Sequence, residues 1–95
     1  MKELTQIRQE LDEVDSELVK LFEQRMQLCR QVAEYKLAHD MPVLDSSREQ
    51  QVLDSRAEKA ADDTLRPYVR RLYVELMALS RAEQQRMLEE AKTSC

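Results

Sequence analysis

Apolar residues recur every three or four positions from residue 4 to residue 35, with no proline or glycine among them. They are Leu4, Ile7, Leu11, Val14, Leu18, Leu21, Leu28, Val32 and Tyr35. This spacing follows one face of an α-helix and predicts a single very long helix over residues 3–38. Pro42 breaks the pattern, because proline fixes its own φ and disfavours helix at the residue before it, so residues 39–45 are predicted to form a loop.

Two more helices are predicted after this loop. Ser46 and Glu49 have the spacing of a capping box with Ser46 as N-cap, and the apolar residues that follow predict a short helix over 46–60. A turn over 61–64 leads into a long third helix over 65–91, which tolerates Pro67 in its first turn. Residues 93–95 are predicted to fray.

The composition supports an all-α fold and narrows the classes of function. Glycine is absent, which excludes Gly-rich phosphate loops, and Leu, Glu, Gln, Arg, Ala and Met dominate, as is typical of helices. The 95 residues are enough for one domain, predicted to span 1–95. The 15 basic and 19 acidic residues are interspersed, so no nucleic-acid partner is expected.

Metal, membrane and export signals are all weak. Two cysteines 66 positions apart and one histidine have no metal-ligand spacing, so we expect no metal and no cofactor. No apolar run approaches the roughly 20 residues that span a bilayer, and no apolar signal core follows Met1. We expect a cytoplasmic protein without a membrane partner, in which Cys29 and Cys95 are reduced.

The length of the first predicted helix indicates an assembly. Its 36 residues would span roughly 54 Å at 1.5 Å per residue, whereas a compact chain of this size is only about 32 Å across. Much of the apolar stripe would lie in water in a monomer. We therefore predict an intertwined homodimeric helical bundle, with a second copy aligned along that stripe.

Polar residues stand at positions where the helical pattern calls for apolar ones. Arg25 lies between Leu21 and Leu28, and Lys36 follows eleven residues later, about 20° round the helix. Ser80 and Gln84 continue an apolar row of the third helix. Buried cations need anions, which leaves two interpretations open: an ion pair of Arg25 with an acid of the second helix, or a bound anionic ligand.

Arg8 lies 17 residues before Arg25, roughly 25 Å along the same helix, so one small ligand cannot touch both within one chain. In an antiparallel dimer, Arg8 of one subunit would approach Arg25 of the other. The alternative is a solvated arginine. Cys29 is interpreted as a small core residue.

Taken together, these residues resemble the all-helical class of chorismate mutases along nearly the whole chain. The motifs that carry the resemblance are Ile7-Arg8, Leu11 with Asp12-Glu13-Val14-Asp15, Leu21 to Arg25-Met26, Val32-Ala33-Glu34-Tyr35-Lys36, Pro42-Val43-Leu44-Asp45, Arg48-Glu49-Gln50, Met77-Ala78-Leu79-Ser80-Arg81 and Gln84. The resemblance implies a homodimer that converts chorismate to prephenate in phenylalanine and tyrosine biosynthesis. Each site would be completed by Arg8 of the other subunit.

The resemblance also implies roles for these residues. Arg25 and the partner's Arg8 would hold the two substrate carboxylates, supported by Arg48 and Ser80. Lys36 and Gln84 would donate to the ether oxygen, and Glu49, with the backbone near Asp45, would bind the ring hydroxyl. The reaction is an intramolecular rearrangement, which needs no nucleophile, metal or cofactor and relies on restraint and charge stabilisation.

Two alternatives stay open. One is isochorismate-pyruvate lyase activity on the same fold, which residue types separate poorly from the mutase. The other is a non-catalytic helical dimerisation module with Arg25 and Lys36 in structural salt bridges, against which the inward Ser80 and Gln84 count. Whether the domain works alone or within a larger protein stays equally open.

Overall fold

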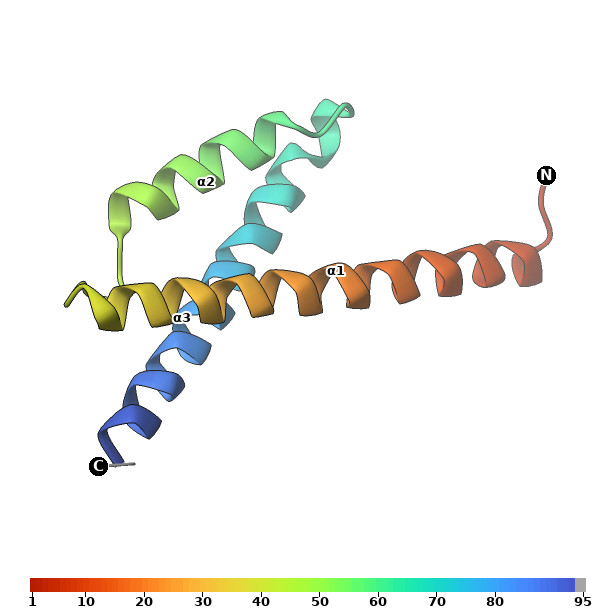
Figure 1. The fold of residues 1–95 in the computed structure, drawn as a ribbon. Coiled ribbons are helices and arrows are strands. Elements are labelled where there is room, and N and C mark those ends of the chain that lie inside the picture. Colours follow the sequence, from red (N-terminus) through yellow and green to blue (C-terminus); the bar gives the residue numbers. More distant parts are fainter. Residues whose placement is uncertain (94–95) are drawn as a thin grey trace.

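A computed structural model describes residues 1–93, which form three α-helices and one 3₁₀ turn and contain no strand (Figure 1). Helix α1 spans Leu4–Ala38, α2 spans Ser46–Glu58, and α3 spans Arg66–Thr93, preceded by the 3₁₀ turn η1 at Asp63–Leu65. The predicted all-α fold with a long, a short and a long helix is confirmed. Helix α3 continues through Thr93, and the rest of the tail predicted to fray, Ser94 and Cys95, lies outside the described residues.

Helix α2 begins at residue 46 as predicted, but its predicted N-cap is wrong. Its N-cap is Asp45, whose Oδ1 accepts a hydrogen bond from the backbone N–H of Arg48 at 3.1 Å, and Ser46 is the first helical residue. Aspartate and serine cap helices about equally well, so local sequence does not choose between neighbours. Because Asp45 caps the helix, Glu49 does not close a capping box with Ser46 and is available for contacts elsewhere. The helix ends at Glu58, two residues earlier than predicted.

The end of α1 shows how a chain without glycine turns sharply. Asp40 has φ 55°, in the left-handed region that glycine usually occupies after a helix. The N–H of Met41 bonds to the carbonyl of Lys36 at 2.8 Å and closes the last turn. The loop then folds back on α1, so that Nζ of Lys36 donates to the carbonyl of Val43 at 2.7 Å.

Only part of α1 packs against another helix. Helix α3 crosses the carboxyl-terminal half of α1 and packs against α2, while the amino-terminal half of α1 projects alone (Figure 1). The chain measures 60 × 27 × 14 Å with a radius of gyration of 17.1 Å, against about 12 Å for a compact chain of this length. The buried apolar core of the described residues is correspondingly small: Ala33, Val52, Ala57 and Met77.

The projecting half of α1 exposes its apolar stripe. Leu11, Val14 and Leu18 are each more than half exposed, although they occupy the positions that the sequence pattern assigns to a buried face.

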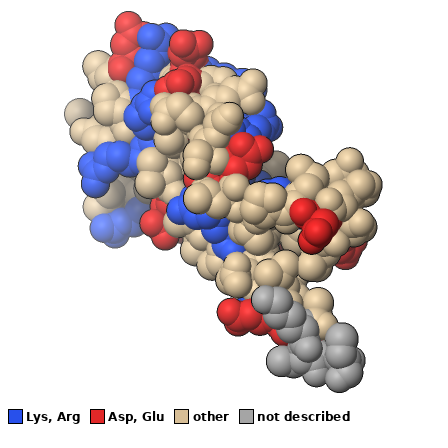
Figure 2. All heavy atoms as spheres, turned by 90° about the vertical axis from the view of Figure 1, so that its left-hand side faces the viewer, with Lys and Arg blue, Asp and Glu red and all other residues tan. Residues whose placement is uncertain are grey.

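Residues 1–93 contain no helix that is both long enough and apolar enough to cross a membrane. On the face seen from the carboxyl-terminal end of α1, basic and acidic side chains both appear and lie next to one another in several places (Figure 2).

Candidate active site

A cavity of about 170 Å³ lies where the three helices meet. Its walls come from the carboxyl-terminal half of α1, the loop after it, the first three turns of α2 and the middle of α3. Of the eight residues predicted for the site, seven line this one cavity: Arg25, Lys36, Asp45, Arg48, Glu49, Ser80 and Gln84. Residues up to 59 positions apart in the chain are thus brought together.

Helix α1 supplies two half-buried cations to this cavity. Arg25 lies with Nη1 3.7 Å from Cys29 Sγ and its guanidinium carbon 5.7 Å from the centre of the Tyr73 ring, a cation–π arrangement. Lys36 is held by its bond to the carbonyl of Val43. Neither cation has a carboxylate partner among residues 1–93, so the alternative of an ion pair between Arg25 and an acid of α2 is not what the structure contains.

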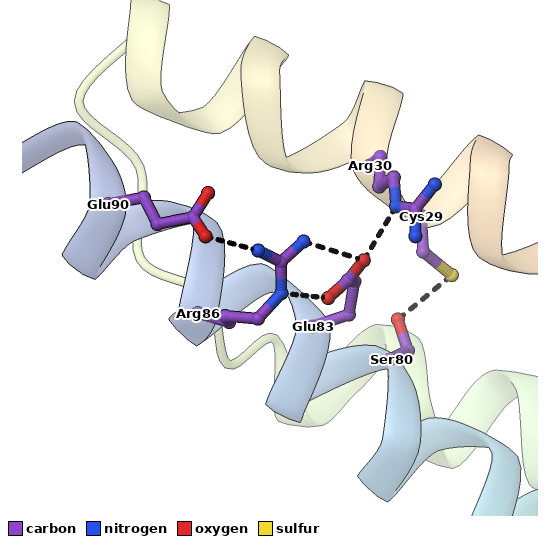
Figure 3. A network of polar contacts seen from close by, with 6 residues as sticks. All are labelled: Cys29, Arg30, Ser80, Glu83, Arg86 and Glu90. Carbon is purple, nitrogen blue, oxygen red and sulfur yellow. Dashed lines mark hydrogen bonds and ion pairs between the residues drawn. The ribbon is translucent and has the colours of Figure 1, made fainter.

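Helix α3 contributes a chain of neutral polar groups. Nε2 of Gln84 donates to Ser80 Oγ at 2.9 Å. Ser80 Oγ in turn donates to Cys29 Sγ at 3.0 Å, which links α3 to α1 (Figure 3). Gln84 is only 6% exposed, and its Oε1 is a buried polar atom without a hydrogen-bond partner among the described residues. A buried amide oxygen left unpaired is costly, so this atom is available to accept a hydrogen bond from a polar ligand.

Helix α2 presents its first turn to the cavity. Arg48 is exposed and donates from Nη1 to Gln51 Oε1 at 2.8 Å, while Asp45 is occupied as the N-cap. Glu49 is half-buried and forms an ion pair with Arg81 of α3. The first turn of α2 therefore offers one arginine and one paired carboxylate to a ligand.

Two arginines of the cavity wall were not predicted as site residues from the sequence. Arg56 and Arg81 both line the cavity, which brings its basic residues to five against the two acids Asp45 and Glu49. Arg56 lies on α2 two turns after Arg48, and its Nη1 donates to Ser55 Oγ at 2.9 Å. Arg81 lies directly after Ser80 in the family motif, which was the one available signal. This excess of positive charge fits a ligand with more than one negative charge.

A second polar cluster fixes the crossing of α1 and α3 beside the cavity. Glu83 of α3 accepts hydrogen bonds from Arg30 of α1 at 2.6 Å and from Nε of Arg86 at 2.6 Å, and Arg86 also reaches Glu90 (Figure 3). Hydrogen bonds from Arg86 and then Arg30 lower the pKa of Glu83 from 4.5 to about 2. The bond from Arg30 joins α1 to α3 at the residue directly before Gln84, whereas the bond from Arg86 lies within α3.

Arg8 is the one predicted site residue that the chain does not bring to the cavity. It is exposed on the projecting half of α1 and does not line the cavity. The helical rise places it roughly 25 Å from Arg25. A single chain therefore leaves Arg8 without a role at this cavity.

The family model for chorismate mutase type II matches residues 7–85, a range that contains every residue of the cavity wall. The chain belongs to this family. A comparison with solved structures found no match to this chain.

Curated relatives agree with the family match. The T-protein of Haemophilus influenzae is 37% identical over 82 residues, covering 77% of this chain and 22% of that protein. A chorismate mutase of Methanocaldococcus jannaschii is 35% identical over 54 residues (57% of this chain, 54% of the relative), and a 4-amino-4-deoxychorismate mutase of Streptomyces pristinaespiralis is 34% identical over 71 residues (74% and 55%). The chain spans between about a fifth and just over half of the length of these relatives.

Proposed function

We propose that this chain is a chorismate mutase domain over residues 1–95, an isomerase that rearranges chorismate to prephenate. The observation that carries the proposal is the cavity wall, where Arg25, Lys36 and Arg48 converge without carboxylate partners within residues 1–93 around a buried amide, that of Gln84. Chorismate is a flexible dianion, and unpaired cations in a half-buried cavity favour such a ligand. Membership of the family makes chorismate the first substrate to test.

Binding would begin with the carboxylates. Arg25 grips one of them with its planar guanidinium, whose orientation is limited by Cys29 and the Tyr73 ring. Arg48 and Ser80 support this anchoring from α2 and α3. Holding both ends of a flexible molecule restrains it in the reactive shape, which removes much of the entropic part of the barrier.

Charge stabilisation would come from Lys36 and Gln84. As the ether C–O bond breaks, negative charge develops on the oxygen, and a preorganised donor there lowers the barrier. The Gln84 amide now donates to Ser80, and its oxygen is unpaired. A half-turn of the amide lets the Ser80 hydroxyl donate to Oε1 and directs the NH₂ group toward the substrate, so that both ends of the amide are paired when substrate is bound.

The second substrate carboxylate requires a second chain. The exposed apolar stripe on the projecting half of α1 supports a homodimer aligned along that helix, because burial of such a stripe is a strong driving force. In an antiparallel pair, Arg8 from the partner's α1 approaches the cavity and binds the second carboxylate. Each site then needs both subunits.

The decisive experiment is an assay of purified protein with chorismate, following loss of chorismate absorbance and formation of prephenate. Rapid conversion to prephenate supports the proposal. Faster turnover of isochorismate with release of pyruvate would assign the chain to lyase activity instead. Absence of turnover with a correctly folded helical protein would favour the non-catalytic dimerisation module.

The relatives also name a second substrate of the same kind. The Streptomyces pristinaespiralis protein is named for 4-amino-4-deoxychorismate, in which an amine takes the place of a ring hydroxyl. Both molecules carry the same two carboxylates and the same ether, so Arg25, Lys36 and Gln84 would serve either one. In our assignment Glu49 is the residue that faces the ring hydroxyl.

A further inference from the structure

Arg81 has no role in the assignments made so far, although it lies between Ser80 and Gln84 on α3. Its Nη1 forms an ion pair with Oε1 of Glu49 on α2, and both side chains line the cavity. The two side chains are 38% and 24% exposed, so neither is free in bulk water. Arg81 is therefore in direct contact with the carboxylate assigned to the ring substituent.

We propose that Arg81 determines which ring substituent the site accepts: by pairing with Glu49 it makes the site favour a neutral hydroxyl and reject an ammonium. This inference rests on the proposed function, in which Glu49 accepts the ring hydroxyl. Arg81 acts through Glu49 and does not touch the reacting atoms, so it is a specificity-determining positioning residue.

The physical reason is the charge that the ligand meets at this wall. An ionised carboxylate has about four lone-pair sites, so one that receives a guanidinium can still accept a hydroxyl proton. An ammonium placed at the same point would meet a carboxylate already neutralised and a guanidinium of like charge beside it. Like charges in a half-buried site oppose binding, and such repulsion is an effective source of specificity.

The rest of the wall strengthens this argument. Arg25, Lys36, Arg48 and Arg56 already make the cavity positive, and the only other acid among the described residues that line it, Asp45, is engaged as the N-cap of α2. Glu49 is thus the one carboxylate able to attract a cationic group, and Arg81 occupies it. Removing Arg81 would leave the Glu49 carboxylate without its ion-pair partner.

A matched control exists on the same helices. Arg70 of α3 pairs with Asp54 of α2 at 2.5 Å, with side chains 42% and 55% exposed, and neither residue lines the cavity. This ion pair joins the same two helices as Arg81 and Glu49 do. Its loss therefore reproduces the structural effect of losing an α2–α3 ion pair without changing the charge at the site.

The test compares kcat/KM for chorismate and for 4-amino-4-deoxychorismate near pH 7, where an alkyl amine is protonated. We expect the wild-type protein to prefer chorismate. Arg81→Gln should shift the ratio toward the amine by about tenfold or more, Arg81→Lys should keep the wild-type ratio, and Arg70→Gln should leave it unchanged. Arg81→Met serves as a second neutral variant that preserves the aliphatic packing of the side chain.

The outcomes separate this inference from the proposed function. If the wild-type protein turns over chorismate but folded Arg81→Gln and Arg81→Met keep its substrate ratio, the specificity role is wrong and the proposed function stands. A wild-type protein that prefers the amine also overturns the role of Arg81. If both neutral variants are unfolded by circular dichroism, Arg81 is structural. A folded wild-type protein inactive on both substrates overturns the proposed function together with the inference.

Discussion

In the proposed reaction Gln84 is a neutral hydrogen-bond donor, which suits a rearrangement that needs no base. Gln84 is 6% exposed. Its Nε2 donates a hydrogen bond to Ser80, whereas its Oε1 has no hydrogen-bond partner among the described residues. A carboxamide does not change its protonation state over the ordinary pH range, so it can donate to a developing negative charge at any pH. A carboxyl group in the same place would donate only when protonated.

Gln84→Glu should therefore make activity depend on pH. We expect kcat/KM of the wild-type protein to be nearly flat between about pH 5 and 8, and that of the variant to rise toward acid as the new carboxyl becomes protonated. At neutral pH the loss should be of the order of 10²–10³, the usual effect of removing one such donor. Profiles of kcat/KM for both proteins across this range provide the measurement.

Gln85→Glu is a suitable control, because residue 85 is exposed and does not line the cavity around Gln84. This control should retain the wild-type activity and its flat profile. A folded Gln84→Glu protein that is fully active at pH 7.5, with an equally flat profile, would show that residue 84 does not reach the reacting oxygen.

Residues of this kind were visible in the sequence because they interrupt a periodic pattern. Arg25, Ser80 and Gln84 stand where apolar residues are expected, and the structure places all three at one cavity. Arg81 gives no such signal, since its partner Glu49 is 32 positions away and only the packing of α2 against α3 brings them together. Local pattern identifies polar residues on a buried face, but not their partners across helices.

At the scale of the elements, the crossing of α1 and α3 depends on few contacts. None of the described side chains is fully buried. Glu83 joins the two helices through Arg30 and also bonds Arg86 on its own helix. Arg86 and Arg30 hold the pKa of Glu83 at about 2, well below its ordinary value of 4.5. A carboxyl whose pKa is lower in the folded state stabilises the fold above its unfolded pKa and loses this effect as pH falls through the folded value.

Glu83→Gln should reduce the stability of the fold near neutral pH and make that stability less sensitive to a fall in pH. The contribution of the Glu83 carboxylate is fully present above about pH 4.5 and declines toward pH 2, so the wild-type and variant melting temperatures should converge over that interval. Thermal unfolding followed by circular dichroism between pH 7 and pH 2.5, at one protein concentration, measures this convergence.

Glu17→Gln supplies the comparison, because Glu17 is exposed and pairs only loosely with Lys20 on its own helix, at 3.5 Å. Loss of this surface pair should change stability by no more than about 0.5 kcal/mol. A constant difference in melting temperature between wild-type and Glu83→Gln proteins at every pH would contradict the assignment of the acid-sensitive contact to Glu83.

The helices could be predicted because the spacing of apolar residues and the position of the helix-breaking proline agree. The apolar row from Leu4 to Tyr35 and the proline at 42 fixed α1 to within one residue of its observed start and at its observed end. The first residue of α2 was predicted correctly, but its N-cap was placed one residue too late, since Asp45 and Ser46 are both good caps and only the loop geometry decides between them. The reversal at Asp40 was invisible, because aspartate rarely takes the place of glycine there.

At the scale of the whole molecule, two features of the single chain are unusual. Its 60 Å length comes from a helix whose amino-terminal half projects away from the other described elements, and Arg8 on that half is remote from the cavity. The proposed homodimer resolves both features, because it covers the stripe and brings Arg8 to the partner's site.

Mixing two inactive variants tests this sharing of sites. Arg8→Ala and Arg25→Ala proteins should each be nearly inactive, but after subunit exchange a heterodimer holds one site with both arginines and one with neither. Random mixing of a closed two-fold dimer makes half of the dimers mixed, so activity should recover to about a quarter of the wild-type value.

Arg71→Ala, mixed with Arg25→Ala, provides the reference, because Arg71 is exposed and does not line the cavity. In that mixture the activity should be proportional to the amount of Arg71→Ala subunits, and subunit exchange should not increase it. No recovery in an Arg8→Ala and Arg25→Ala mixture shown by mass spectrometry to contain heterodimers would exclude a contribution of Arg8 across the interface.

The uneven support of α1 also governs how its backbone amides exchange with solvent deuterium. An unsupported helix of about 17 residues is only marginally stable in water, because nucleation is costly and few hydrogen bonds repay it. In a separated subunit, amides before residue 20 would exchange quickly while those around the buried Ala33 stay protected. In the proposed dimer both halves are held, so the contrast in exchange rate within this one helix measures the fraction of assembled protein without any substrate.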